Sequence, residues 1–509
     1  EEQLTKIVTD QENSKFIKFF NEAKPITIKL HQLKLLPGVG QKRMWTIIES
    51  RKQKKYDSYK DIDIQIGKEH LASIQVIPKP DGKIEIELLG KRINISSAFC
   101  WATTSQKNTE AVTVLVLVKT GSKYEKKEIN GISHFLEHMY FKGTKKRPTT
   151  LVIAETMDKI GGIYNAFTSE ECTGYYAKTV STQFDTALDW VSDIFLNSTL
   201  SSKEIEKEKG VITEEINMRL DHPMTYVHVL WSKLLYGDQP AGWDIIGTKE
   251  NISNMTRKKL VDYMNEQYVS SNTIVCVAGN INSDLAVKKV KKHFSKIKEA
   301  EPAKKQSVVE RQSEPEIIIQ TRKTDQTHLC LGTRAYNLFH TQKYAQKLLA
   351  VILGGMMSSR LFVKIREKLG MAYYISTISE ANPDSGYLLT QIGVDNKKVE
   401  TVILAVLEEY KKISKQKVPA SELKKAKNYV KGKTALLLEP SDALASFFAN
   451  QELLEGKIST LKEIFKKVDK VSSSDILKVA KDIFQPQKLN LALIGPFDNK
   501  KKFKKILKL

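Results

Sequence analysis

His134-Phe135-Leu136-Glu137-His138 is the stretch that decides this fold, because it places two imidazoles and one carboxylate within five residues of an amphipathic segment. Positions i and i+4 share one face of a helix, so His134 and His138 can hold one metal ion between them. Glu137 lies beside them and can take a proton from a water molecule at the metal. The alternative is an ordinary pair of surface histidines, so the rest of the chain has to decide.

A metal site of this kind needs a third protein ligand and an open fourth position. A second helix is expected over Ser202–Leu220, where isoleucines recur with helical spacing. Glu215 flanks the apolar stripe of this helix and Glu214 points toward solvent, so Glu215 is the expected third ligand. Glu208 lies two turns earlier on the same flank and is expected to support the catalytic site from behind the ligands. The alternative is a charged surface helix with ordinary ion pairs.

With these residues in place, the chain resembles the pitrilysin family of inverted zincins, which includes insulin-degrading enzyme, the mitochondrial processing peptidase and bacterial half-length peptidases. The resemblance covers residues 107–509. Glu215 follows His138 by 77 residues, a separation similar to that in the family. Two further runs resemble the family, one at residues 141–144 after the motif and one at residues 161–168.

The resemblance implies a zinc-dependent endopeptidase with one zinc ion per chain. His134, His138 and Glu215 would hold the zinc, and Glu137 would act as the general base. Glu208 falls where members of the family carry an additional acidic residue. The implied substrates are peptides or unfolded protein segments, cleaved inside a closed chamber.

The resemblance also implies where the substrate lies. In relatives, the segment that carries Asn165 and Ala166 is an edge strand beside the metal, and an extended peptide can add to such a strand whatever its side chains. From the second half of the chain, Arg366 and Tyr373 are implied to reach across and steady the substrate. Both side chains can donate hydrogen bonds to developing negative charge.

Other functions remain open on sequence grounds. A nucleic-acid-associated or peptide-binding protein could use the same fold as a scaffold, and a metal-binding chaperone could enclose peptides without cutting them. The presence of all three expected ligands and of the base favours the enzyme. The family resemblance suggests a homodimer or a heterodimer with a paralogue.

The fold class indicated is α+β, with two homologous α/β sandwich-like peptidase domains and a small helical N-terminal module. Apolar strands at Ala111–Val118 and Thr273–Gly279 open and close the first half, and residues 316–320 and Leu489–Gly495 repeat that rhythm in the second. The expected domains are a helix-hairpin-helix-like module (1–65), a β-rich connector (66–106), the zinc-binding catalytic domain (107–300), a linker (301–315) and a non-catalytic homologous domain (316–509).

Residues 35–40, Leu-Leu-Pro-Gly-Val-Gly, resemble a helix-hairpin-helix motif. In that motif Gly38 and Gly40 let backbone N–H groups approach a phosphate, with Lys42 and Arg43 nearby. This predicts sequence-independent contact with the backbone of DNA or RNA. One alternative is a packing module whose glycines only make the turn. Another is a fusion of two unrelated pieces, because the family's first strand is not found cleanly before residue 107.

The composition fits a multidomain protein of 509 residues with 41% hydrophobic content. Lys and Arg number 81 against 59 Asp and Glu, but the excess is spread along the chain, which favours a lysine-rich proteome over a nucleic-acid groove. Four widely spaced cysteines without a C-x-x-C pair indicate neither a zinc knuckle nor a disulfide scaffold, and no apolar run reaches the length of a membrane span. The lysine-rich residues 500–505 are expected to form a solvated tail. We expect a cytoplasmic protein; because the chain begins with Glu-Glu rather than Met, a periplasmic or exported protein that has lost an upstream segment is the alternative.

Overall fold

The computed structural model describes residues 109–509 throughout and, before them, only the backbone of six strands. These six strands are β1 (Pro25–Thr27), β2 (Leu30–His31), β3 (Ile74–Pro78), β4 (Ile84–Leu88), β5 (Lys91–Ile93) and β6 (Cys100–Ser105). Strands β1 and β2 pair with each other, and β3, β4 and β5 form a small antiparallel sheet. The predicted nucleic-acid-binding residues Gly38, Gly40, Lys42 and Arg43 lie outside the described residues.

Two five-stranded sheets with the same arrangement dominate the described chain. In the first, the strand order is β6-β10-β7-β9-β8, and in the second it is β11-β15-β12-β14-β13. One outer pair in each sheet is parallel, and the remaining pairs are antiparallel. The strands are β7 (Ala111–Val118), β8 (Ile163–Thr168), β9 (Thr173–Val180), β10 (Thr273–Gly279), β11 (Glu316–Thr321), β12 (Gln326–Arg334), β13 (Ala372–Ala381), β14 (Gly386–Asp395) and β15 (Leu489–Gly495). The prediction of an α+β protein with two homologous halves is confirmed.

Strand β6 is the outer strand of the first sheet, where it runs parallel to β10. From the sequence alone, these residues were expected to belong to the connector before residue 107. The short run Cys100–Ser105 carries no signal of its own that separates it from the strands of the connector, and only its pairing with Ile274–Gly279 places it in the larger sheet.

Helices flank both sheets. In the first half they are α6 (Ile132–Met139), α7 (Thr150–Asp158), α8 (Phe184–Asn197), α9 (Ser202–Leu220), α10 (Pro223–Tyr236), α11 (Lys249–Ser253), α12 (Arg257–Gln267) and α13 (Ser283–His293). In the second half they are α14 (Lys343–Ala350), α15 (Val399–Lys415), α16 (Ala420–Leu437), α17 (Ser441–Asn450), α18 (Leu461–Lys470), α19 (Ser473–Ile483), α20 (Lys500–Ile506) and the π-helical segments η7 (Val351–Gly355), η8 (Phe362–Lys368) and η10 (Gln451–Glu455). The predicted helix over Ser202–Leu220 is confirmed.

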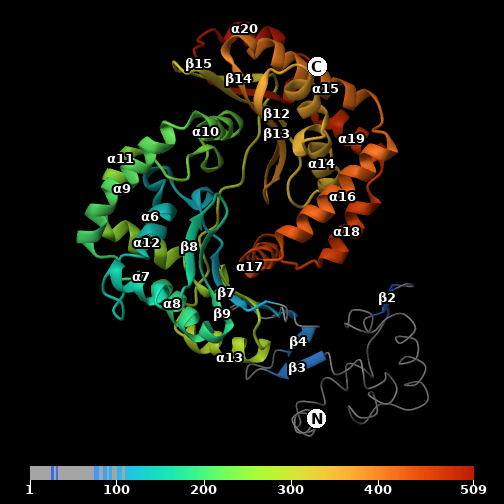
Figure 1. Cartoon of the computed structure of the whole chain (residues 1–509). Coiled ribbons are helices and arrows are strands. Elements are labelled where there is room, and N and C mark those ends of the chain that lie inside the picture. The colour runs from blue at the N-terminus through green and yellow to red at the C-terminus, as the bar shows by residue number, and fades with distance from the viewer. Residues whose placement is uncertain are drawn as a thin grey trace, which may run out of the picture.

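The apolar run of β7 is buried on both faces because a helix of each half packs against the sheet of the other half. Successive side chains of a strand point to opposite faces. Val114 and Val116 join the core beneath α6 and α8, whereas Leu115 and Leu117 join a second cluster with α17 of the other half. Reciprocally, α10 of the first half packs on β12, β14 and β15 of the second sheet. Figure 1 shows the two halves side by side, with α10 at one junction and α17 at the other.

The predicted linker has neither helix nor strand, but it is held along its length. The side chain of Gln239 donates to the Val309 carbonyl at 3.0 Å and accepts from the Val309 N–H at 2.8 Å. Gln312 donates to the Leu489 carbonyl at 2.9 Å. The linker therefore lies against both halves in a defined path.

The expectation of a solvated lysine-rich tail was wrong. Lys500–Ile506 forms α20, and Phe503 within it is fully buried in the core of the second half. The lysines of α20 reach acidic partners, with Lys502 beside Glu400 and Lys504 beside Glu314. Within the described residues, none of the helices combines the length and the apolar character needed to cross a bilayer.

Candidate metal centre

Helix α6 is fixed by its apolar side and by a buried carboxylate at its start. Phe135, Leu136 and Met139 are fully buried beneath the sheet. The Glu125 carboxylate accepts hydrogen bonds from the N–H groups of Gly131 at 2.8 Å and Ser133 at 2.9 Å, which are otherwise unpaired at a helix start. Burial raises the pKa of Glu125, and these hydrogen bonds oppose that rise. The helix is thus anchored one turn before its histidines.

Helix α9 presents Glu215 to the same place. Ile205, Ile212 and Ile216 are buried and form the predicted stripe. Glu214 is exposed, as expected, whereas Glu215 is only partly exposed. The helical spacing therefore turns the Glu215 side chain toward α6.

The structure brings His134, His138 and Glu215 together, with their ligand atoms within 4.8 Å of one another. The Nε2 atoms of both histidines lie 3.6 Å from the Oε2 atom of Glu215. Two ligands at about 2.1 Å from one tetrahedral zinc ion stand about 3.4 Å apart. The separations are too long for hydrogen bonds and match this value. Two imidazole nitrogens and one carboxylate oxygen therefore fit a zinc ion.

The second nitrogen of His138 has a partner. Its Nδ1 atom lies 2.8 Å from Oε1 of Glu208, whose Oε2 atom lies 2.6 Å from the Lys142 ammonium. Burial opposes ionisation of Glu208, but the hydrogen bonds from His138 and Lys142 outweigh it and hold its pKa below the ordinary value. Glu208 is therefore a buried anion behind the candidate ligands, on the flank of α9 that the helical spacing predicts.

The ring of His134 is held neutral. Burial, the neighbouring His138 ring and the charge of Arg219 lower the pKa of His134 to about 3. Its Nδ1 atom is buried and has no hydrogen-bond partner within the described residues. A neutral imidazole is the form that binds a metal ion.

Glu137 lies on the same helix and contacts strand β8. Thr168 Oγ1 donates a hydrogen bond of 2.5 Å to Glu137 Oε2. Burial raises the pKa of Glu137, while the hydrogen bond from Thr168 opposes the rise. The carboxyl group is thus less acidic than a free glutamate, as a group that accepts a proton should be.

Asn165 and Ala166 lie on β8, which is the edge strand of the first sheet. Ala166 is buried and Asn165 is exposed. Helix α6 packs beside this strand, so the open edge lies next to the histidines and Glu137. Figure 1 shows β8 next to α6 on the side of the first half that is turned toward the second.

Arg366 and Tyr373 lie together on the second half, in η8 and at the start of β13. The Arg366 guanidinium stands 6.0 Å from the centre of the Tyr373 ring, which is 77% exposed. In the part of the chain that the structure describes, neither side chain forms a hydrogen bond or an ion pair with the first half, and the guanidinium lies over the rings of Phe362 and Tyr373. The structure therefore brings these two residues to each other, but not to the histidines.

Reasoning from sequence missed three residues at this centre: Thr168, Lys142 and Glu125. Thr168 and Lys142 belong to the two runs that resemble the family, but the sequence did not indicate a role for either side chain. Glu125 precedes α6 by a loop, and its capping contacts depend on how that loop folds. No local periodicity signals such contacts.

Two peptidase family models match the sequence of the two halves that carry this site. The model of the family described as Insulinase (Peptidase family M16) matches residues 101–249, and that of the Peptidase M16 inactive domain matches residues 254–430. Residues 1–86 match a different family, described as a protein of unknown function (DUF655).

Curated proteins that are similar to about three quarters of this chain are named zinc proteases. The uncharacterized zinc protease YmxG of Bacillus subtilis is 38% identical over 76% of this chain and 94% of its own length. An uncharacterized zinc protease of Rickettsia felis is 33% identical over 76% of this chain and 93% of its own length. The crystal structure of a protease from Helicobacter pylori, 24% identical, has the same fold, with a TM-score of 0.74 over 83% of this chain and 99% of that one. The chain therefore belongs to the insulinase family of peptidases, family M16, and is a zinc metallopeptidase.

Proposed function

We propose that this peptidase is an endopeptidase that holds one zinc ion per chain through His134, His138 and Glu215. The observation that carries the proposal is the convergence of both Nε2 atoms on one Glu215 oxygen at 3.6 Å. With zinc bound, these three side chains would hold a Lewis acid, which would acidify a water molecule and polarise the scissile carbonyl.

Glu137 is the general base in this proposal. It takes a proton from the attacking water and passes it to the leaving amine. Its Oε2 atom is occupied by Thr168, which leaves Oε1 for this proton transfer. Glu208 supports the chemistry indirectly, because it fixes which nitrogen of His138 carries the hydrogen.

The substrate in this proposal is a peptide or an unfolded protein segment that adds to β8 as a further strand. An open edge offers backbone hydrogen bonds that do not depend on sequence, which suits varied substrates. Asn165 and Ala166 align this strand, and Arg366 with Tyr373 contacts it from the second half. We further propose that cleavage takes place in a closed chamber formed by a homodimer or a dimer with a paralogue.

The test is cleavage of a mixed peptide library by the full chain, with and without a zinc chelator, beside Glu137→Gln. Glu214→Gln serves as the matched control, because Glu214 neighbours the ligand Glu215 but is exposed. We expect cleavage to vanish with the chelator and in Glu137→Gln, and to persist in Glu214→Gln. Normal cleavage by Glu137→Gln would contradict the assignment of the base.

The separate family match over residues 1–86 leaves room for a second role. We propose that Gly38, Gly40, Lys42 and Arg43 contact the backbone of DNA or RNA without regard to sequence. Retention of the full chain on a DNA column should fall steeply with salt, and Lys42→Ala with Arg43→Ala should flatten that dependence. Equal retention of both proteins would contradict the proposal.

A further inference from the structure

The open edge of β8 has a defined backbone pattern. At the turn after β8, the Ser169 N–H donates to the Cys172 carbonyl, so Ser169 faces strand β9. Neighbouring residues of an antiparallel strand face its two sides in alternation. Ala166 and Thr168 therefore direct their N–H and C=O groups away from β9, toward the open edge.

The Ala166 N–H agrees with this direction. It donates to the side-chain oxygen of Asn165 at 2.9 Å rather than to β9. Thr168 lies two residues further along β8, so its backbone N–H and C=O groups point to the same open edge. A peptide that pairs with β8 thus meets Ala166 and Thr168 in sequence.

The side chain of Thr168 contacts the base. Its hydroxyl donates to Glu137 Oε2 at 2.5 Å, and no other hydrogen bond reaches that carboxylate within residues 109–509. One residue therefore offers its backbone to the open edge and its hydroxyl to Glu137. The position of an added strand and the orientation of the base are fixed by the same residue.

We propose that Thr168 is a positioning residue that holds the Glu137 carboxylate in register with the substrate strand on β8. This inference rests on the proposed role of Glu137 as the general base. The hydroxyl occupies one carboxylate oxygen and turns the other toward the reacting water. Without it the carboxylate rotates about its side-chain bonds, and proton transfer loses its alignment.

The test compares Thr168→Val, Thr168→Ala and Thr168→Ser, with Thr179→Val as the matched control. Valine keeps the shape of threonine but cannot donate, whereas serine keeps the hydroxyl. Thr179 lies in the neighbouring strand β9, and its buried hydroxyl has no hydrogen-bond partner within the described residues. The measurements are kcat, KM, zinc content and the affinity of a peptide for Glu137→Gln with and without Thr168→Val.

We expect kcat to fall by about tenfold to a hundredfold in Thr168→Val and Thr168→Ala, with KM, zinc content and peptide affinity unchanged. Thr168→Ser should recover most of kcat, and Thr179→Val should keep it. An unchanged kcat in Thr168→Val and Thr168→Ala would overturn the inference, as would loss of zinc or of folding in both. If Glu137→Gln itself cleaves normally, the proposed function fails instead, so the two failures are distinguishable.

Discussion

The Nδ1 atom of His138 lies 2.8 Å from the Oε1 atom of Glu208, a buried carboxylate on another helix. An ionised carboxylate can only accept hydrogen bonds, so Nδ1 carries the hydrogen. The lone pair of Nε2 is then free and faces Glu215 at 3.6 Å. Glu208 thus orients the His138 ring, so that Nε2 is the nitrogen available to a metal ion.

We predict that Glu208→Ala weakens zinc binding by about 10- to 100-fold, because the His138 ring loses its orientation and Lys142 loses its partner. Competition with a chromogenic chelator measures the affinity. Glu204→Ala is the control, since Glu204 lies on the same helix and its ion pair among the described residues is with Lys207 at the surface. Equal zinc affinities of the two variants would contradict the role of Glu208.

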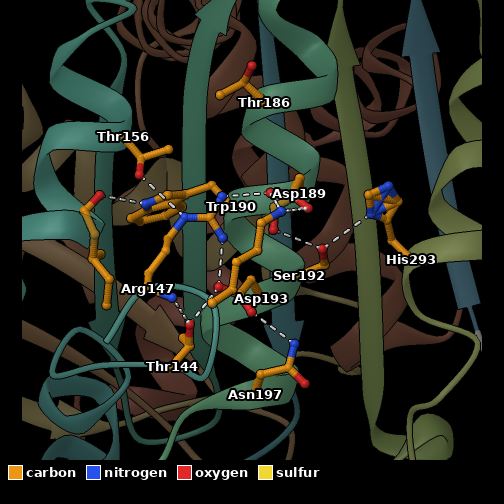
Figure 2. A network of polar contacts seen from close by, with 12 residues as sticks. Thr144, Arg147, Thr156, Thr186, Asp189, Trp190, Ser192, Asp193, Asn197 and His293 are labelled. Atoms are coloured by element: carbon orange, nitrogen blue, oxygen red, sulfur yellow. Dashed lines mark hydrogen bonds and ion pairs between the residues drawn. The ribbon is translucent and has the colours of Figure 1, made fainter. Parts of the chain in front are cut away.

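A second polar network fixes the segment that follows α6. Figure 2 shows Arg147 and Thr144 reaching toward Asp193 on α8. Arg147 Nη1 and Thr144 Oγ1 meet Asp193 Oδ2 at 2.6 and 2.7 Å, and Asn197 donates to Oδ1 at 2.9 Å. Asp193 is buried, so these three side chains take the place of water as its hydrogen-bond donors.

Asp193→Ala should lower the free energy of unfolding by about 1.5 to 3 kcal/mol, because it removes one of the two carboxylates that pair with the buried Arg147 guanidinium, the other being Asp189. Urea denaturation followed by tryptophan fluorescence measures the change. Asp185→Ala is the matched variant on the same helix, where Asp185 pairs with Lys289 at the surface, and it should cost at most about 1 kcal/mol. Similar midpoints for both variants would show that the Asp193 network does not stabilise the fold.

Arg366 and Tyr373 form a pair on the second half whose role rests on resemblance to the family. We predict that Arg366→Met and Tyr373→Phe each lower kcat/KM by about 10²- to 10³-fold, because each removes a donor to the developing negative charge. Zinc content should stay the same, since within the described residues neither side chain forms a hydrogen bond or an ion pair with the histidines. Tyr429→Phe, which alters a partly exposed tyrosine on α16, is the control. Peptide cleavage at several substrate concentrations gives the ratio, and wild-type values in both variants would remove the pair from the mechanism.

The residues of the candidate metal centre could be found from the sequence because their signals are local. His134 and His138 are spaced for one helix face, and the isoleucine stripe of α9 selects Glu215 over Glu214. Strands such as β7 were predictable from the length and composition of their apolar runs. In each case the decisive pattern lies within one element.

The contacts between elements were not predictable in this way. The hydrogen bond from Thr168 to Glu137 joins residues 31 positions apart, and its formation depends on how β8 packs on α6. The same holds for Phe503, whose burial requires the sheet of the second half to lie beneath it. The sequence of α20 is rich in lysine and has one large apolar side chain that is buried, Phe503, so it resembles a solvated tail as long as the surface that covers Phe503 is unknown.

A cluster of four charges joins the two halves through the linker. The Lys123 ammonium lies 2.9 Å from Glu171 Oε1 and 3.1 Å from Asp384 Oδ1. Lys305 of the linker lies 2.6 Å from Glu171 Oε1 and 3.1 Å from Asp384 Oδ2. Glu171 follows β8, and Asp384 lies between β13 and β14, so the cluster ties together the ends of both edge hairpins.

We predict that Asp384→Asn destabilises the protein at neutral pH and removes part of its sensitivity to acid. Burial opposes ionisation of Asp384, but Lys123 and Lys305 hold its pKa below the ordinary value. Because the folded-state pKa is depressed, the stabilisation is complete above the unfolded-state pKa of about 3.9 and is lost as the pH falls through the folded-state value. Urea midpoints at neutral pH and across the acid range should therefore converge for the wild type and Asp384→Asn as the pH falls. Asp498→Asn, at an exposed position, should follow the wild type at every pH; a gap between the wild type and Asp384→Asn that stays constant down to the lowest pH would contradict the prediction.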